Sequence, residues 1–220
     1  DSNTNVFYLS QGGLGLGDRD YYTDPSNQAI KDGYRNYIAG LFSLAKCVSD
    51  PQEAAAAVVE FEDKLAEVSW TSVENRDYTK QYNPMSSEEV AKTFKGFDFT
   101  SYFKEGGFPA IEKIIVMQPS FFQGMSELFS KTDLETLKNY MAASLIGGAC
   151  SSTSDDLYDI YFDFFGRQMS GITEKKPRWK RAMSVPNSTL GMAVGQMYVA
   201  RYFPESSKQQ VLQLVENLRT

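Results

Sequence analysis

Apolar side chains recur every three or four residues through most of the chain, which is the spacing that places them on one face of an α-helix. The clearest case begins at Asp24-Pro25, an N-cap followed by a proline at the first helical position, and continues to about Cys47. Its apolar face comprises Ile30, Tyr34, Tyr37, Ile38, Leu41 and Leu44. The pattern predicts a long amphipathic helix.

Capping residues mark the starts of further helices. Asp50-Pro51 followed by Glu53, Ser86 followed by Glu89, and Thr132 followed by Glu135 each fit a capping box. Ser154 marks another start, and Asn187 or Ser188 a later one. The predicted helices are 54–70, 86–94, 121–129, 132–149, 154–165, 187–202 and one that begins at Pro204.

Two short runs favour β-strands, residues 6–9 and residues 114–117. A proline-containing basic segment over 175–186 is predicted to be a connector between helices. No repeat of 20–50 residues is visible. The pattern therefore predicts a mainly α-helical fold, a multi-helix domain over residues 1–220 with at most two short strands.

Composition narrows the classes of protein that fit. The chain has 220 residues, of which 42% are hydrophobic, so a large core is possible. The formal net charge of −6 argues against nucleic acid as a partner, because phosphate binding needs a basic face. The sequence holds no apolar run of about 20 residues, the length that a membrane helix needs.

The ends of the sequence suggest a piece of a longer protein. The chain starts at Asp1 without a methionine. An apolar stripe from Val211 to Leu218 continues to Thr220 without a glycine, asparagine or proline stop signal. We expect that further chain precedes and follows it.

Histidine is absent from the whole sequence. A Ser-His-Asp or Cys-His arrangement needs an imidazole base, and a His-Glu-x-x-His zinc helix needs two imidazole ligands. All three are therefore excluded within this chain. Cys47 and Cys150 are its only cysteines. Two free, buried thiols are the preferred interpretation, and a single disulfide is the alternative.

Two other features of the sequence are candidate ligand sites. Asp155, Asp159 and Asp163 share a spacing of four, which predicts an acidic surface stripe; a hard-cation site is the alternative, although the calcium-loop pattern is absent. The basic run from Lys175 to Arg181 predicts a solvated connector around a buried Trp179, with a nucleic-acid or membrane patch as the alternative.

Aromatic residues crowd one predicted helix on more than one face. They predict a helix that is buried on most sides rather than a ligand pocket. The residues are Tyr158, Tyr161, Phe162, Phe164 and Phe165.

Residues 11–22 combine closely spaced glycines with a single arginine. Gly13, Gly15 and Gly17 lack the full dinucleotide-binding pattern, and the next helix signal comes too late for a phosphate site. Glycines that permit positive φ or close packing explain the spacing better. Arg19 is predicted to pin the turn by bonding a backbone carbonyl or a carboxylate, with substrate contact as the alternative.

The same block resembles the Gly-Leu-Gly-Leu-Pro-x-Arg-Asp-Tyr-Tyr signature of the neprilysin-like zinc peptidases (M13), which include the bacterial PepO-type endopeptidases. Gly17 replaces the usual proline, and Ala182 stands where many animal members have a cysteine. Further segments resemble the family in the same order. They are Arg76-Asp77, Tyr82-Asn83-Pro84-Met85, Val116-Met117-Gln118-Pro119, Leu137 to Tyr140, Gly171 with Pro177 to Arg181, Gly191 to Val199, and Phe203 with Ser207-Lys208.

The resemblance implies a segment of a two-lobed metalloendopeptidase. The family encloses a cavity between two helical lobes, and its zinc ligands and catalytic glutamate belong to the C-terminal lobe. This chain resembles the central part of the N-terminal lobe, without the zinc-binding lobe, so no catalytic, substrate-binding or metal-binding residue is carried over. The family's substrate-carboxylate arginine is expected upstream of Asp1.

The resemblance also sets what we expect of the parent protein. It would carry zinc, with the C-terminal lobe and peptides as partners, and it would lie in the cell envelope or outside the cell. The chain alone would restrict substrates without catalysing cleavage. The rival interpretation is a stand-alone helical module that binds proteins or peptides without catalysis.

Overall fold

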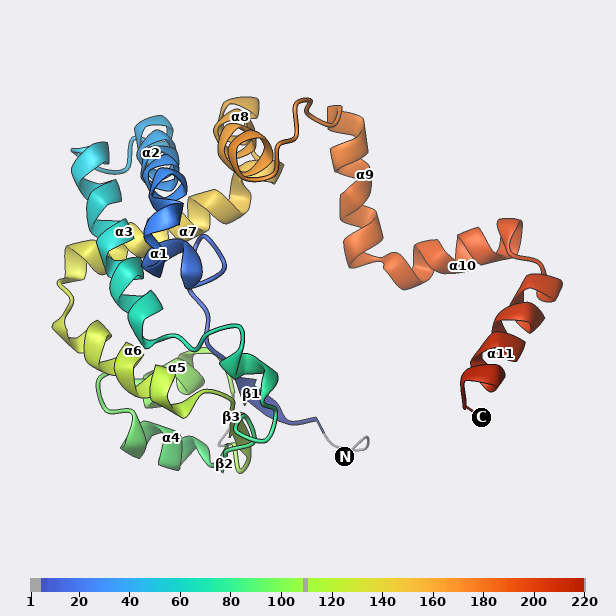
Figure 1. The fold of residues 1–220 in the computed structure, drawn as a ribbon, viewed down its shortest axis with the longest axis horizontal. Helices are drawn as coiled ribbons and strands as arrows, with labels where there is room; N and C mark the ends of the chain where they lie inside the picture. The colour runs from blue at the N-terminus through green and yellow to red at the C-terminus, as the bar shows by residue number, and fades with distance from the viewer. Residues whose placement is uncertain (1–4, 109–110, 220) are drawn as a thin grey trace. The chain divides into compact units, whose positions relative to one another are not determined.

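The computed structural model describes residues 5–108 and 111–219. The chain divides into two units, residues 1–173 and residues 174–220, and each is described by itself (Figure 1). The expectation of one domain over residues 1–220 stays a prediction. The mainly helical fold class is confirmed, since helices dominate both units.

The first unit is a helical body with a small sheet at one end. The long helices α2 and α3 lie side by side, and α7 packs across both (Figure 1). The helices of this unit are α1 Asp20–Thr23, α2 Gln28–Ala45, α3 Pro51–Val68, α4 Ser87–Thr93, α5 Phe99–Glu105, α6 Pro119–Lys131, α7 Leu134–Ala149 and α8 Asp155–Tyr161, which continues as a π-helical segment, Phe162–Met169.

The sheet has three strands in the order β1-β3-β2. Strand β1, Phe7–Leu9, pairs in parallel with β3, Ile114–Val116, with Phe7 opposite Ile114. Strand β2, Pro84–Met85, is antiparallel to β3. Both predicted strands are present, but the expected limit of two strands was one too few. A two-residue strand is too short to show an alternating pattern, which is why β2 was missed.

Helix α3 contributes side chains to two clusters of buried residues. Ala55 and Val58, both 0% exposed, belong to the cluster with α2 and α7. Phe61 and Leu65 belong to the cluster around the sheet, α4, α5 and α6. Because each cluster needs a different face of α3, this one helix joins the two halves of the core.

The predicted caps are mostly correct. Asp50 accepts hydrogen bonds from the backbone N–H groups that begin α3, and Ser86 with Glu89 forms both bonds of a capping box. Ser154 caps α8. Thr132 was the wrong choice for α7, because the cap is Asp133, which accepts from the Thr136 backbone at 2.8 Å. Thr132 instead ends α6, where its hydroxyl bonds the Leu128 carbonyl.

The second unit contains α9 Arg178–Thr189, α10 Gly191–Tyr202 and α11 Glu205–Arg219. The predicted connector over 175–186 was wrong, since most of it is α9 and Pro186 lies inside that helix. Pro186 removes one intrahelical hydrogen bond and its ring crowds the preceding turn, yet the helix continues to Thr189. Neither Asn187 nor Ser188 caps the next helix, which begins after Leu190.

Apolar side chains in the second unit are exposed. Trp179, predicted to be buried, is 65% exposed, with Lys180 Nζ 5.4 Å from its ring centroid. Met192 is 89% exposed and Leu218 79%. None of the residues described in α9, α10 or α11 is buried. These helices therefore bring amphipathic faces but no core of their own.

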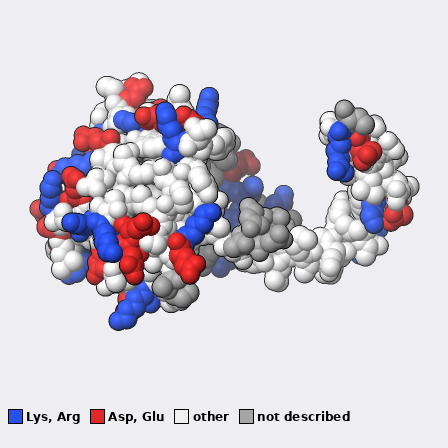
Figure 2. All heavy atoms as spheres, turned by 90° about the horizontal axis from the view of Figure 1, so that it is seen from below, with Lys and Arg blue, Asp and Glu red and all other residues white. Residues whose placement is uncertain are grey.

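The distribution of charged side chains on the surface and the hydropathy of the helices agree with the predictions made from composition. On the face shown in Figure 2, lysine and arginine alternate with aspartate and glutamate and form no single basic patch. Within residues 5–108 and 111–219, no helix has both the length and the apolar content needed to cross a bilayer.

Candidate functional site: the glycine block and its buried carboxylate

Residues 11–22 are here called the glycine block. At the first residue of the block, hydrogen bonds join it to the rest of the first unit. The Gln11 side chain donates to the Trp70 carbonyl at 3.0 Å and accepts from the Trp70 backbone N–H at 2.8 Å. The Gln11 backbone N–H donates to Gln118 Oε1 at 2.9 Å. The block is thereby joined to the end of α3 and the start of α6.

Glycine is required in this block by backbone conformation and by close packing. Gly13 and Gly17 have φ values of +94° and +84°, where other residues are strained. Gly13 also accepts a hydrogen bond from the Tyr140 hydroxyl at 2.7 Å. The predicted role of these glycines in positive φ and close approach is confirmed.

Three consecutive backbone N–H groups of the block, those of residues 15–17, have partners inside the protein. Gly15 donates to Glu62 at 3.2 Å, Leu16 to the Tyr22 hydroxyl at 3.0 Å, and Gly17 to the Leu14 carbonyl at 3.0 Å. A phosphate cradle needs such groups free to face a ligand. The arrangement therefore fits a turn that is held in place by internal hydrogen bonds rather than a nucleotide site. We call this hydrogen-bonded turn the clasp.

Glu62 is the centre of this clasp. Its side chain is 2% exposed on α3 and accepts from Tyr22 Oη at 2.5 Å, Tyr34 Oη at 3.1 Å and the Gly15 backbone. One carboxylate thus joins the block, α1, α2 and α3. Glu62 is not among the residues predicted from the sequence, although it occupies an apolar-face position of α3, four residues after Val58 and four before Ala66.

Burial controls the charge of this carboxyl group. Desolvation raises the pKa of Glu62 to about 7, and it outweighs the three hydrogen bonds that favour the ionised form. The same burial, together with the Glu62 charge, raises the pKa values of Tyr22 and Tyr34 well above the ordinary range. Both hydroxyls therefore remain donors to Glu62 at any physiological pH.

Arg19 has the structural contact that its position predicted. Its guanidinium donates to the Ser69 carbonyl at 3.0 Å, which links the block to the C-terminal end of α3. Beside it, Asp18 accepts from the Ser72 hydroxyl at 3.0 Å. The alternative role of Arg19, contact with substrate, stays a prediction.

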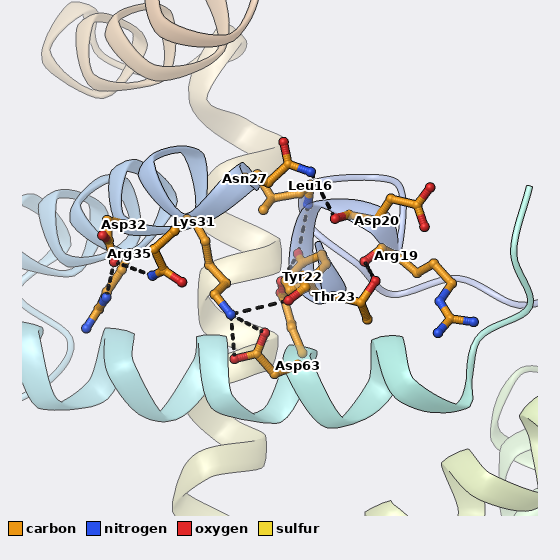
Figure 3. A network of polar contacts seen from close by, with 12 residues as sticks. Leu16, Arg19, Asp20, Tyr22, Thr23, Asn27, Lys31, Asp32, Arg35 and Asp63 are labelled. Carbon is orange, nitrogen blue, oxygen red and sulfur yellow. Dashed lines mark hydrogen bonds and ion pairs between the residues drawn. The ribbon is translucent and has the colours of Figure 1, made fainter. Parts of the chain in front are cut away.

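A second polar network covers the outside of the clasp (Figure 3). Lys31 Nζ on α2 lies 3.0 Å from an Asp63 carboxylate oxygen on α3, and donates to the Tyr22 carbonyl at 3.4 Å. Asn27 donates to the Asp20 carbonyl at 3.0 Å. These contacts hold α1 between the two long helices.

A hollow of about 310 Å³ opens beside the clasp, between α2, α7 and the π-helical segment. We call it the tyrosine groove, and its aromatic lining consists of Tyr34, Tyr37, Tyr140, Tyr161 and Phe165. The prediction of a helix buried on most sides is correct only in part, because Phe162 and Phe164 are buried but the other three aromatic residues are half-buried. However, Tyr161 and Phe165 also line this hollow, which the sequence interpretation did not expect.

The residues present do not fit a zinc ion. The chain has no histidine, and within the described ranges no three Cys, Asp or Glu side chains form a group that could hold a metal. Asp163 is paired with Arg167 at 2.5 Å on the same helix, which fits the predicted surface stripe. We therefore derive no chemical step at a metal from these residues.

The two thiols are free, so the disulfide alternative was wrong. Cys150 is buried, as expected, and burial raises the pKa of its thiol. Cys47 is exposed, which contradicts the expectation of two buried thiols. It lies just past the end of α2, where the chain turns at the surface towards α3.

Comparison with known proteins gives the family to which this helical chain with its glycine block belongs. The N-terminal model of Peptidase family M13 matches residues 1–220. The chain belongs to Peptidase family M13.

Particular relatives agree with this assignment. Neprilysin-11 of Caenorhabditis elegans is 27% identical over all of this chain and 28% of its own length. Neutral endopeptidase of Lactobacillus helveticus is 27% identical over 99% of this chain and 34% of its own length. The chain spans about a third of the length of the curated relatives it matches.

A solved structure also supports the assignment to this family. The zinc metalloprotease Zmp1 of Mycobacterium tuberculosis, in complex with an inhibitor, superposes with a TM-score of 0.89 at 30% identity. The superposition covers 96% of this chain and 32% of that one.

Proposed function

We propose that this chain is the substrate-restricting part of the N-terminal helical lobe of a zinc endopeptidase. It shapes the wall of a reaction chamber, admits peptides and keeps folded proteins away from the catalytic centre. Zinc and the catalytic residues belong to another part of the parent protein, where a metal supplies Lewis-acid activation of water. The residues of this chain take no part in bond cleavage.

The match of the N-terminal M13 model to residues 1–220 is the observation that carries this proposal. Relatives whose names describe them as endopeptidases or as similar to one support the activity of the parent. The absence of histidine from the sequence supports a catalytic centre elsewhere. The exposed apolar faces of α9, α10 and α11 support a C-terminal catalytic lobe as the partner that covers them.

We place the parent protein in the cell envelope or outside the cell, by analogy with the family. Its substrates are peptides in that compartment. One curated relative, membrane metallo-endopeptidase-like 1 of Mus musculus, carries a membrane location in its name.

Metal analysis and peptide hydrolysis test the proposal when made on the 220-residue chain and on the parent protein in parallel. The parent is expected to hold about one zinc ion and to cleave short peptides in a chelator-sensitive manner. The chain alone is expected to hold no stoichiometric zinc and to leave the peptides intact.

Three results would contradict the proposal. One is a tightly bound zinc ion on the chain alone, and another is a parent protein that cleaves folded proteins as fast as short peptides. The third is a coding sequence that stops directly after Thr220, which would favour a stand-alone binding module. A His-Glu-x-x-His helix encoded downstream supports the proposed lobe.

A further inference from the structure

We propose that the open edge of strand β1 and the apolar hollow beside it bind an extended peptide that carries an apolar side chain. The main chain of the peptide pairs with β1 as an added strand, and its apolar side chain fills the hollow. The inference deepens the proposed function, on which its part in substrate selection rests, because it names the class of peptide that this lobe holds.

Strand β1 is paired on one side, by β3. Among the described residues no strand lies on its other side, since the sheet has the order β1-β3-β2. Leu9 faces β3, because its carbonyl accepts from the Met117 N–H at 2.8 Å. In a parallel ladder one residue directs its N–H and its C=O to the same neighbouring strand, and the next residue directs both the other way. The N–H and C=O of Tyr8 therefore point to the open side, where a peptide can pair with them.

The β1 edge lacks the side chains that usually keep other strands away. Edge strands are commonly guarded by charged side chains or by prolines. The opposite edge of the sheet follows this rule, because β2 contains Pro84, which has no N–H to donate. The sequence from Asn5 to Gln11 contains neither a proline nor a charged residue, and Tyr8 is 59% exposed. This contrast between the two edges indicates that β1 receives a further strand.

The apolar hollow, of about 280 Å³, begins where β1 ends. Ser10, which follows β1 directly, and Gly12 line it together with side chains from α3, α6 and α7. Its aromatic walls include Phe61 and the pair Phe97 and Phe129, which meet edge-on with ring centroids 5.1 Å apart. No charged side chain belongs to the described lining. Such a lining selects an apolar group, because a polar group without a hydrogen-bond partner is costly to bury.

The volume of the apolar hollow suits one large side chain. A cavity of about 150 Å³ lined by apolar side chains binds benzene. The hollow is larger, about 280 Å³, and so accommodates a phenylalanine or a leucine side chain. Met141, which lines it, is 69% exposed, so the hollow opens to the surface.

The edge and the hollow are placed to act on one peptide. Side chains on the same side of a strand recur at every second residue, about 7 Å apart. Tyr8 and Ser10 are separated by the same step. A peptide residue that pairs with Tyr8 therefore has its second neighbour beside Ser10, at the hollow. Main-chain pairing supplies affinity, and the hollow selects the side chain.

The test compares three peptides by following the amide chemical shifts of the 220-residue chain. The first is acetyl-Thr-Ser-Thr-Phe-Thr-amide, the second has asparagine in place of phenylalanine, and the third is the first with every backbone nitrogen methylated. The first is expected to bind about tenfold more tightly than the second, because burial favours the phenylalanine side chain. The third is expected not to bind, because it cannot donate to β1. The shifts should include those of Tyr8, Ser10 and Gly12.

Variants test the edge and the hollow separately. Tyr8→Pro removes the N–H on the open side and leaves the pairing with β3 intact, so the first peptide is expected to bind about tenfold more weakly. Tyr8→Thr keeps the N–H and is the matched control, with an affinity within about twofold of wild type. Met141→Asp places a charge in the lining and is expected to weaken binding about fivefold. Leu145→Asp, one turn further along α7, 75% exposed and outside the lining, should leave the affinity unchanged.

The proposal is overturned by equal binding of the first two peptides, by binding of the methylated peptide, by the absence of saturable binding, or by equal effects of Met141→Asp and Leu145→Asp. A chain that dimerises through β1, detected by sedimentation and abolished by Tyr8→Pro, would overturn it too.

The parent protein, kept inactive by a chelator, provides the last comparison. Tyr8→Pro is expected to weaken its binding of the first peptide as it does in the 220-residue chain. If the substitution has no effect in the parent, another segment of the parent covers β1 and the proposal fails. Because these experiments measure binding without catalysis, their failure is distinct from failure of the proposed function, which would show in the zinc and hydrolysis assays of the parent.

Discussion

The Tyr34 hydroxyl lies so close to the Cα of Gly15 that a Cβ built at position 15 would be 1.7 Å from it. Tyr34 cannot easily move away, because it is 5% exposed and donates to the buried Glu62. The φ angle of Gly15 is not positive. Glycine is required here by the space that a phenol occupies, in contrast to Gly13 and Gly17.

Gly15→Ala is therefore expected to destabilise the fold by about 3 kcal/mol, because it overpacks the core and breaks the hydrogen bond between Tyr34 and Glu62. Urea unfolding followed by circular dichroism measures this loss. Gly12→Ala is the control, since a Cβ there has no atom within 4 Å, and its effect should stay within about 0.5 kcal/mol. Equal effects of the two substitutions would count against the packing argument.

The raised pKa of Glu62 predicts how stability depends on pH. The folded protein holds the Glu62 proton up to about pH 7, whereas the unfolded chain releases it near 4.5. The folded state binds more protons in this window, so this group's contribution to stability falls as pH rises through it. The full difference corresponds to about 3 kcal/mol.

Glu62→Gln isolates that contribution. The difference in unfolding free energy between wild type and Glu62→Gln is expected to fall by about 3 kcal/mol from about pH 4.5 to about pH 8. Denaturant titrations at a series of pH values provide the measurement. A difference that stays constant, or that grows in favour of the wild type, would show that Glu62 is not kept neutral by burial.

Loss of the Asp50 cap at the start of α3 is predicted to reduce stability less than the changes at Gly15 and Glu62. Its carboxylate accepts from the Gln52 and Glu53 backbone N–H groups at 2.9 and 3.1 Å. Asp50→Ala is expected to cost about 1 kcal/mol, whereas Asp50→Asn retains the acceptor and should cost much less. Thermal unfolding of the two variants checks the order. If Asn is as damaging as Ala, the carboxylate charge rather than capping is responsible.

A substitution at Gly96 is predicted to destabilise the fold more than the loss of the Asp50 cap does. A Cβ there would lie 1.9 Å from the Ser126 carbonyl oxygen, which is backbone of α6 and cannot rotate aside. Gly96→Ala is expected to cost about 3 kcal/mol or more, or to prevent folding, because α6 must shift. Gly148→Ala, at an open helical position, should instead stabilise by about 0.5 kcal/mol. Unfolding curves of both variants, measured together, test this contrast.

Much of the first unit could be predicted from local sequence. Ser86 with Glu89 and Asp50 with Pro51 place helix starts correctly, because the groups that form a cap lie within four residues of each other. The choice of Thr132 over Asp133 failed because two adjacent residues offer the same kind of acceptor. Only the chain geometry at the end of α6 separates them.

The candidate site was harder to predict, because its contacts join distant parts of the chain. Glu62 receives bonds from Gly15, Tyr22 and Tyr34, which precede it by 47, 40 and 28 residues. Its place on the apolar face of α3 was a visible signal of a buried carboxyl group with partners. The partners themselves depend on tertiary packing, as does the exposure of Trp179, which no periodicity reveals.

The parallel pairing of β1 with β3 has a consequence for biosynthesis. Residues Phe7–Leu9 cannot complete their pairing until Ile114–Val116 has been made. At about 5–20 residues per second, the ribosome needs roughly 5–20 s to synthesise the intervening stretch. During that interval β1 has no partner strand, so its apolar residues can contact chaperones and other nascent chains. Slower growth at low temperature lengthens the wait, so the yield of soluble protein will depend on chaperone supply as well as on the final fold.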